Sequence, residues 1–553
     1  MVKQTAKHGK TDGKANNKTN RKTNNKTDGK KTLKHTIKQM REKKMTSELI
    51  PRVLISADRS SSGKTTISMG IMAALKAKGY AVQPFKVALD YIDPEYHTEI
   101  AGRRSRNLDG YLMGEEGVTD VFAHACASLE NSDKPAEIAV IEGVRGLYEG
   151  LTADSDIGST AQISKILKCP VIMVINARSM TRSCAALIKG FASFDPDVNI
   201  AGVILNNIGS KRHAEKAVAA IESSTGIPVI GIVFRNPEMD FWMRELGLIP
   251  IPEGRKTYDR FSERIELIKK TVMDGVDLDK LVQIAQTAGP VKLPEKSRFE
   301  ERKTKSGEIS PKIGVAFDEA FNFYYPDNMD LMLAQGAEIE LFSPLWDDKI
   351  PDVDAIYIGG GTPEIFAMEL SQNESMKESI KKASAAGMPI FAESAGMNYL
   401  TNKMTIKSKG VPGTPNTSGT PNTSGTPNTS GTSDMPGISF GMVGLFDCTT
   451  VYGSGKRVVT YTNGTFERDT PVGKKGNKFI AHEFHHSVLE DISDDIEYAI
   501  GISRGVGIKD KKDGMIVNNT VGTYVHYHGS SYTDFAKNFV ESAIEYQKKK
   551  RHQ

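Results

Sequence analysis

The feature that most constrains the fold is an apolar run that leads through a serine- and glycine-containing turn into an amphipathic stretch. Residues 52–63 read RVLISADRSSSG, and KTTISMGIMAALKAKG follows them. A Gly-Lys-Thr between a strand and a helix is the core of a P-loop, in which backbone N–H groups and the lysine bind phosphate. Asp58 stands where the strict pattern has glycine, so the loop is a deviant one. The predicted nucleotide-binding residues are Ser61, Ser62, Gly63, Lys64, Thr65 and Thr66.

Apolar runs alternate with longer amphipathic stretches over most of the chain. IAVIEG, CPVIMVIN and IAGVILN are such runs before residue 250, and the alternation resumes at Lys312 with KIGVAF. This pattern is typical of βα units with a buried parallel sheet. We therefore predict an α/β fold with a P-loop domain at 46–270, a linker at 271–310 and a second α/β domain at 311–547.

Two low-complexity segments stand apart from these domains. Residues 1–45 hold 15 Lys/Arg and 3 Asp/Glu in a Lys/Asn/Thr-rich run, and we predict a disordered basic tail. Residues 408–437 contain TPNTSG three times in tandem, and their Pro and Gly predict a loop insertion into the second domain. Without the tail, 57 Lys/Arg stand against 65 Asp/Glu, so binding of nucleic acid by the body of the protein is not indicated.

Composition places the chain among ordinary globular proteins. Hydrophobic residues make up 39% and charged residues 25% of its 553 residues. No window approaches 18 consecutive apolar residues, and the N-terminus has no apolar signal segment, so no membrane association is expected. The four cysteines show neither paired nor metal-binding spacing, which favours a reducing cytoplasm. Whether the chain forms a homodimer is left open.

Charged residues follow two of the predicted strands. PFKVALDYIDPEYH places Lys86, Asp90, Asp93 and His97 close together, and IAVIEG ends in Glu142. P-loop enzymes carry an acidic residue that faces Mg²⁺ at such a strand end, and the Thr65 hydroxyl is the usual second ligand. We therefore predict Thr65 and Glu142 as Mg²⁺ ligands. Taken alone, the two aspartates also fit an acidic turn before a proline.

At these motifs the chain resembles the cobyrinate a,c-diamide synthase family. The matching stretches are FKVALDYIDPEYH, IEGVRGLYEG, GSTAQISKIL, GVILNNIGSKRH, DEAFNFYYPDN, IGGGTPEIF, FAESAGMNYL and AHEFHHS, spread over residues 51–547. The resemblance implies a dethiobiotin synthetase-like P-loop domain followed by a class I glutamine amidotransferase-like domain. SADRSSSGKTT and FKVALDYID are most similar to the methanogen branch, which acts on nickel-sirohydrochlorin; the cobalamin branch, which acts on cobyrinate, is the alternative.

The resemblance also implies the chemistry. ATP, with Mg²⁺, phosphorylates tetrapyrrole side-chain carboxylates, and ammonia or glutamine supplies the nitrogen of the amides. Lys64, Lys86, Asp90 and Asp93 match catalytic positions. In the glutaminase half, His485 matches the catalytic histidine, but Ser394 stands where the family has its cysteine nucleophile.

A serine at the nucleophile position changes what we expect of the second domain. A hydroxyl is far less ionised than a thiol near neutral pH, and Ala395 adds a Cβ where the family has glycine. We therefore predict that Ser394 is inactive and that the protein uses free ammonia. The alternatives are a non-catalytic paralogue that binds nucleotide or tetrapyrrole, and a positioning ATPase of the chromosome-partition type, in which Arg59 would stand at the signature-lysine position.

Overall fold

The computed structural model describes residues 49–129, 134–239, 243–244, 247–248, 261–302, 310–407 and 437–552. The predicted basic tail at 1–45 lies outside these residues, and so does the predicted insertion at 408–437 except for Gly437. The two α/β regions predicted from the apolar runs are both present, and each is built on its own large sheet.

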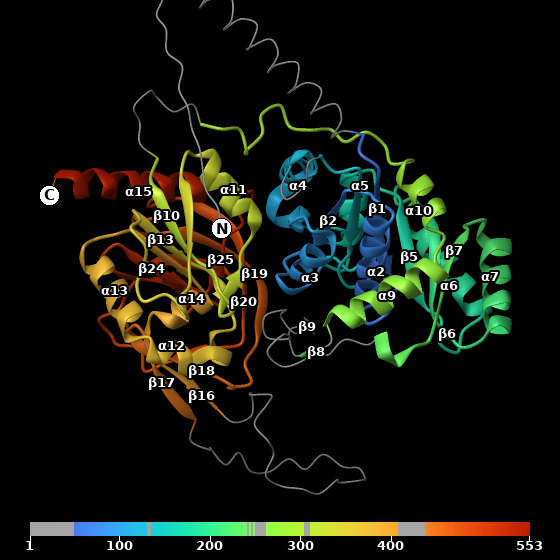
Figure 1. Ribbon diagram of the computed structural model, residues 1–553. Helices are drawn as coiled ribbons and strands as arrows, with labels where there is room; N and C mark the ends of the chain where they lie inside the picture. Colours follow the sequence, from blue (N-terminus) through green and yellow to red (C-terminus); the bar gives the residue numbers. More distant parts are fainter. Residues whose placement is uncertain are drawn as a thin grey trace, which may run out of the picture. The chain divides into compact units, whose positions relative to one another are not determined.

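The first region contains a parallel sheet in which the described strands follow the order β3-β2-β4-β1-β5-β6-β7 (Figure 1). All neighbouring pairs in this sheet are parallel. The strands are β1 (Arg52–Ala57), β2 (Val82–Val87), β3 (Arg106–Leu108), β4 (Ile138–Glu142), β5 (Val171–Asn176), β6 (Ile200–Ile208) and β7 (Val229–Phe234). Strands β1, β2 and β4 are buried along their whole length, as expected for the interior of a parallel sheet.

Helices connect these strands. They are α2 (Lys64–Ala77), α3 (Ile92–Ala101), α4 (Gly110–Ala127), α5 (Thr160–Ile166), α6 (Arg182–Phe194) and α7 (Lys211–Thr225), and α9 (Phe261–Gly275) and α10 (Leu278–Ala285) come after the last strand of the sheet. The short elements η1 (Pro237–Met239), β8 (Met243–Arg244) and β9 (Gly247–Leu248) follow β7. Polar caps set several helix starts; for example, the Asp109 carboxylate accepts the amides of Tyr111 and Leu112 at the start of α4.

The predicted linker at 271–310 begins with ordered structure. Helix α9 continues to Gly275, and α10 buries Leu281 and Ile284 in the same core as β1 and α2. Helices α2 and α9 lie side by side in Figure 1, and a Cβ on Gly70 of α2 would lie 2.4 Å from Val272 of α9. The residues after 270 therefore belong partly to the first region, because their apolar faces complete its core.

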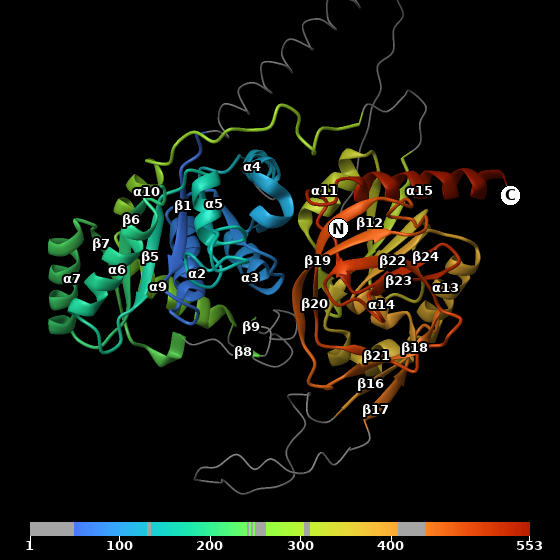
Figure 2. The ribbon, with the colours of Figure 1, turned by 180° about the vertical axis from the view of Figure 1, so that it is seen from behind.

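The second region contains a mixed sheet with the described order β12-β10-β13-β15-β24-β23-β22-β19-β20-β25. The first five of these strands are parallel, and the remaining pairs are antiparallel (Figure 2). The parallel strands are β12 (Glu338–Phe342), β10 (Lys312–Ala316), β13 (Ala355–Ile358), β15 (Ile390–Glu393) and β24 (Thr520–Thr523). The others are β23 (Lys512–Val517), β22 (Glu497–Arg504), β19 (Val458–Phe466), β20 (Lys478–His485) and β25 (Val525–His526). The shift to β-rich structure after the insertion is thus confirmed.

Smaller elements complete the second region. A four-stranded sheet has the order β17 (Ile438–Gly441), β16 (Thr401–Ile406), β18 (Phe446–Tyr452) and β21 (Val488–Glu490), and β11 (Phe321–Phe323) pairs with β14 (Gly360–Gly361). The helical elements are α11 (Pro326–Ala334), η2 (Pro363–Phe366), α12 (Ala367–Gln372), α13 (Glu374–Ala385), α14 (Ala395–Tyr399) and α15 (Asp534–His552). Among the described helices, none is both long and apolar enough to cross a membrane.

Candidate functional site

The P-loop takes the shape that the sequence predicts, between β1 and α2. Gly63 precedes α2 with a left-handed φ of 91°, and an added Cβ would lie 2.1 Å from Asn206 Nδ2. The Ser62 hydroxyl donates to Asp58 Oδ1 at 2.7 Å, and Asn206 Nδ2 donates to the Ser62 carbonyl at 3.0 Å. Asp58, which replaces the glycine of the strict P-loop pattern, thus stabilises the serine-rich loop through its hydrogen bond with Ser62. Ser61 lies in this loop with a φ of 63°, and Thr66 lies in the first turn of α2.

Glu142 is the centre of the polar contacts beside this loop. β4 lies between β1 and β2, with Glu142 level with Ile55 and Lys86. Its Oε1 atom accepts from the Thr65 hydroxyl at 2.6 Å, from Lys86 Nζ at 2.8 Å and from Lys64 Nζ at 3.1 Å. Residues from three segments that are distant in the sequence therefore meet, because the strand order places β4 next to both β1 and β2.

Lys86 is buried among three carboxylates. Besides Glu142, its ammonium contacts the Asp93 carboxylate and lies 3.9 Å from Asp90 Oδ2. Burial alone lowers the pKa of Lys86, but Asp93, Glu142 and Asp90 together raise it above its ordinary value. Lys86 therefore carries a positive charge throughout the physiological pH range.

Burial and neighbouring charges also shift the pKa values of Asp90, Lys64 and Glu142. Burial, and then the negative charge of Asp93, raises the pKa of Asp90 to about 6. Burial lowers the pKa of Lys64, with the nearby Lys86 acting in the same direction. Burial favours the protonated form of Glu142, but the Lys86 and Lys64 ammonium groups hold its pKa well below its usual range. The site thus holds an ionised carboxylate against two buried ammonium groups.

The donor set beside the P-loop is one that Mg²⁺ accepts. The Thr65 hydroxyl and the Glu142 carboxylate meet at 2.6 Å, and both are hard oxygen ligands. Across the described ranges, no group of three or more His, Cys, Asp or Glu side chains has the arrangement of a metal site. Mg²⁺ usually takes one or two carboxylates and completes its shell with water and phosphate, so the residues present fit this ion.

The elbow predicted around Ser394 is present in the second region. β15 ends at Glu393, α14 begins at Ala395, and Ser394 between them has φ 47° and ψ −104°, a strained conformation for a residue with a side chain. The Gly396 amide donates to the Gly359 carbonyl at 2.9 Å, and a Cβ on Gly396 would lie 2.2 Å from the Ile358 carbonyl. The strand-to-helix turn and the neighbouring glycine loop therefore keep their tight geometry around a serine.

His485 lies at the end of β20, and its two ring nitrogens have different surroundings. Its Nδ1 lies 3.0 Å from the Ser487 carbonyl and its Nε2 lies 3.7 Å from Glu483 Oε2. The ring stacks on Tyr524 with 3.8 Å between centroids, next to Thr523, whose carbonyl accepts the Ser394 amide. Within the described part of the chain, no hydrogen bond joins the Ser394 hydroxyl to His485, and the buried His485 Nε2 has no hydrogen-bond partner.

Two residues of the first site were not assigned from the sequence. His97 contacts Glu142 Oε2, and Asn206 holds the P-loop. The sequence placed His97 near Lys86, Asp90 and Asp93 but assigned it no role, although it lies four residues after Asp93 and so on the same face of α3. Asn206 gives no comparable signal, since its contact depends on β6 lying near the loop.

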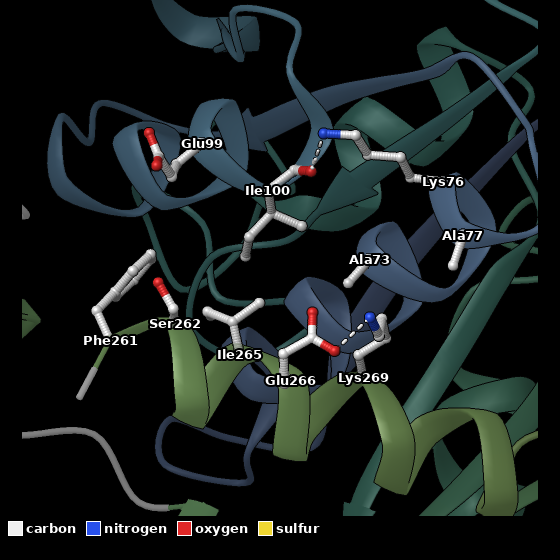
Figure 3. A pocket seen from close by; sticks show the side chains of 10 residues that line it. All are labelled: Ala73, Lys76, Ala77, Glu99, Ile100, Phe261, Ser262, Ile265, Glu266 and Lys269. Atoms are coloured by element: carbon white, nitrogen blue, oxygen red, sulfur yellow. Dashed lines mark hydrogen bonds and ion pairs between the residues drawn. The ribbon is translucent and has the colours of Figure 1, made fainter.

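A separate hollow of about 370 Å³ lies between α2, α3 and α9 (Figure 3). Ala73, Ile100 and Ile265 form part of its lining. Of its charged residues, Lys269 pairs with Glu266 at 2.5 Å, and Lys76 Nζ donates to the Ile100 carbonyl. Because these groups are engaged within the hollow, it presents no set of convergent charges to a ligand.

Two family models match the chain. The CobQ/CobB/MinD/ParA nucleotide binding domain matches residues 53–245, and the CobB/CobQ-like glutamine amidotransferase domain matches residues 312–533. The first match covers the P-loop and the Glu142 site, and the second covers the Ser394 elbow and His485. The two-part α/β fold class predicted from the motifs is confirmed.

Curated relatives match almost the whole chain. A cobyrinate a,c-diamide synthase of Methanosarcina barkeri is 56% identical over 91% of this chain and 98% of its own length. The synthase of the same name from Methanosarcina acetivorans is 56% identical over 89% and 95%, and that of Methanobrevibacter smithii is 40% identical over 89% and 99%. These matches span both regions, whereas a positioning ATPase of the chromosome-partition type would have no use for the glutamine amidotransferase-like region.

Proposed function

Because the chain belongs to the cobyrinate a,c-diamide synthase family, we propose that it is an ATP-dependent ligase that amidates the a and c side-chain carboxylates of a tetrapyrrole. The relatives' name supports cobyrinate as the substrate. The methanogen-type motifs SADRSSSGKTT and FKVALDYID favour nickel-sirohydrochlorin, which we take as the first candidate, with cobyrinate as the alternative.

The proposed reaction has two steps at each carboxylate. A carboxylate oxygen attacks the γ-phosphorus of ATP, the bond to the leaving ADP breaks, and an acyl phosphate forms. Ammonia then attacks the acyl carbon, the bond to phosphate breaks, and the nitrogen loses one proton. Such steps need positioning and charge neutralisation more than covalent chemistry by the protein.

The contacts of Glu142 with Lys64, Thr65 and Lys86 carry this proposal. Lys64 lies at the P-loop and would turn from Glu142 to the phosphates, whereas Lys86 stays among its carboxylates and would neutralise negative charge beside the reacting group. Thr65 and Glu142 would hold Mg²⁺, which neutralises phosphate charge when it is bound with ATP. Asp90 and Asp93, at the start of α3, would orient the tetrapyrrole carboxylate or the water shell of the metal.

We propose that ammonia, rather than glutamine, supplies the nitrogen. Ser394 has a weakly acidic hydroxyl, and within the described residues no hydrogen bond joins it to His485, whose Nδ1 lies 3.0 Å from the Ser487 carbonyl. Serine hydrolases depend on a base that is hydrogen-bonded to the nucleophile, and loss of the nucleophile commonly costs roughly 10³-fold or more in rate. The glutaminase-like region would then act without hydrolysing glutamine.

The test is ADP release together with product mass, using nickel-sirohydrochlorin and cobyrinate in parallel with ammonium. Diamide formation that requires ATP and is lost in Lys64→Met supports the ligase, and the tetrapyrrole that reacts identifies the substrate. If both tetrapyrroles bind but yield neither ADP nor amide, the ligase is refuted and the chain is a non-catalytic binding paralogue.

A further inference from the structure

His97 contacts Glu142 Oε2, the carboxylate oxygen that Lys64, Thr65 and Lys86 do not contact. The side chain is fully buried, and its Nε2–H donates to Glu142 Oε2 at 2.8 Å. Lys64, Thr65 and Lys86 all contact Oε1 instead. Within the described residues, His97 is therefore the hydrogen-bond donor to Oε2, whereas the other three donors contact Oε1.

The helix that carries His97 is itself well fixed. Asp93 and His97 lie one turn apart on the buried face of α3, and they contact the two members of the Lys86–Glu142 ion pair, respectively. The Thr98 hydroxyl donates to the Pro94 carbonyl at 2.7 Å and accepts the Ser105 amide at 2.9 Å, which ties α3 to the chain that enters β3. The imidazole is thus presented from a rigid element to the end of β4.

A glutamate side chain has three rotatable bonds, so a carboxylate that serves a metal must be held in one orientation. In the structure, Lys64 and Thr65 help to fix this orientation through their hydrogen bonds to Oε1. Under the proposed function, Lys64 turns toward phosphate and Thr65 toward the metal, so these two hydrogen bonds to Oε1 are lost. Contacts from residues that do not bind the nucleotide then decide where the carboxylate points.

We propose that His97 is a positioning residue that fixes the Glu142 carboxylate for the Mg²⁺–nucleotide complex. It acts as an N–H donor to Glu142 Oε2 and does not itself touch phosphate or substrate. This inference rests on the proposed role of Glu142 as a metal ligand. A purely structural histidine, in contrast, would affect stability and leave metal-dependent binding unchanged.

The test compares His97→Leu with His97→Gln, whose side-chain amide can place an N–H donor near the position of Nε2. His213→Leu is the matched control, because it removes a partly buried imidazole of the same region that contacts the Met180 carbonyl, away from Glu142. Affinity for a fluorescent N-methylanthraniloyl ADP is measured for each variant with Mg²⁺ and with EDTA, and thermal melting is recorded alongside. If His97→Leu gives no folded protein, His97→Met, which keeps more of the volume, replaces it.

A hydrogen bond to a charged group contributes about 1.5–3 kcal/mol, which corresponds to roughly 10- to 150-fold in affinity. We expect His97→Leu to lower the Mg²⁺-dependent part of nucleotide affinity by this factor, His97→Gln to lie within about threefold of the wild type, and His213→Leu to show no change. Equal Mg²⁺-dependent binding by the wild type and His97→Leu, or equal losses in the Leu and Gln variants, would overturn the inference. If the wild type binds Mg²⁺–nucleotide but amidates no tetrapyrrole, the proposed function fails, while the binding comparison still decides the role of His97.

Discussion

Replacing Lys86 with Met separates the structural role of this residue from its proposed catalytic role. Lys86 lies between the fully buried Glu142 and the buried Asp93, and it provides the positive charge for both. In the variant, Glu142 retains Lys64 at 3.1 Å, whereas Asp93 loses its partner. Most of the cost should therefore come from the isolated Asp93 carboxylate.

The expected magnitude follows from this arrangement. Removing one partner of a buried ion pair typically costs about 3–5 kcal/mol, because the other charge remains in a poorly solvated place. Asp90 contributes less, since it is 3.9 Å away and its side chain is 30% exposed. The double variant Lys86→Met/Asp93→Asn, which removes the isolated charge, should recover about half of the loss in stability.

Hydrogen exchange is the suitable assay, because a chain with two large regions need not unfold in one step. Amides of β2 and β4 should exchange roughly 150- to 5000-fold faster in Lys86→Met, and those of β10 in the other region should not change. The double variant should regain protection while amidation stays at least about 100-fold below the wild type. Recovery of activity together with protection would refute the catalytic role of Lys86, and unchanged exchange in Lys86→Met would refute the electrostatic reasoning.

Three further predictions concern the second region and the P-loop. Burial raises the pKa of Asp513 to about 7, against about 3.9 in an unfolded chain. The folded state therefore binds this proton more tightly than the unfolded state does. As pH rises from 4 to 7, the free energy of unfolding should fall by up to about 4 kcal/mol. Asp513→Asn should remove this loss, and the melting temperatures of the variant and the wild type should diverge between pH 5 and pH 8; a pH-independent difference would contradict the assignment. Gly63→Ala should abolish nucleotide binding in a direct titration, because its Cβ would meet Asn206 at 2.1 Å and its φ is 91°, and wild-type affinity would disprove this. Ser394→Cys should yield less than about 1% of a working glutaminase in an assay of glutamate release, because in the described residues His485 makes its hydrogen bond to the Ser487 carbonyl and none to residue 394; efficient hydrolysis would show that the thiol is all that is missing.

Local motifs made much of both sites predictable. A strand followed by Gly-Lys-Thr and a helix defines the P-loop, because the loop geometry depends on neighbouring residues and requires the left-handed Gly63. The elbow was predictable for the same reason, since the turn at Ser394 lies between a short apolar strand and a helix.

The contacts between segments that are distant in the sequence were harder to predict. That Lys86 and Glu142 meet follows from β2 and β4 being neighbours, and the order of strands in a parallel sheet is not written in their apolar pattern. The polar stretch after residue 270 looked like a linker because α10 is short and amphipathic, yet Leu281 and Ile284 are buried. The orientation of His485 depends on Ser487 and Tyr524, and the latter comes from another part of the chain.

The most direct test of the account is the source of nitrogen. The protein is incubated with ATP, Mg²⁺, nickel-sirohydrochlorin, unlabelled glutamine and ¹⁵N-ammonium, and the mass of the tetrapyrrole product is determined for the wild type and for Ser394→Ala. The account predicts a diamide in which both amide nitrogens carry the label, formed equally by the two proteins. Unlabelled amide nitrogen that disappears in Ser394→Ala would contradict it, because glutamine would then be hydrolysed by a working serine at the elbow.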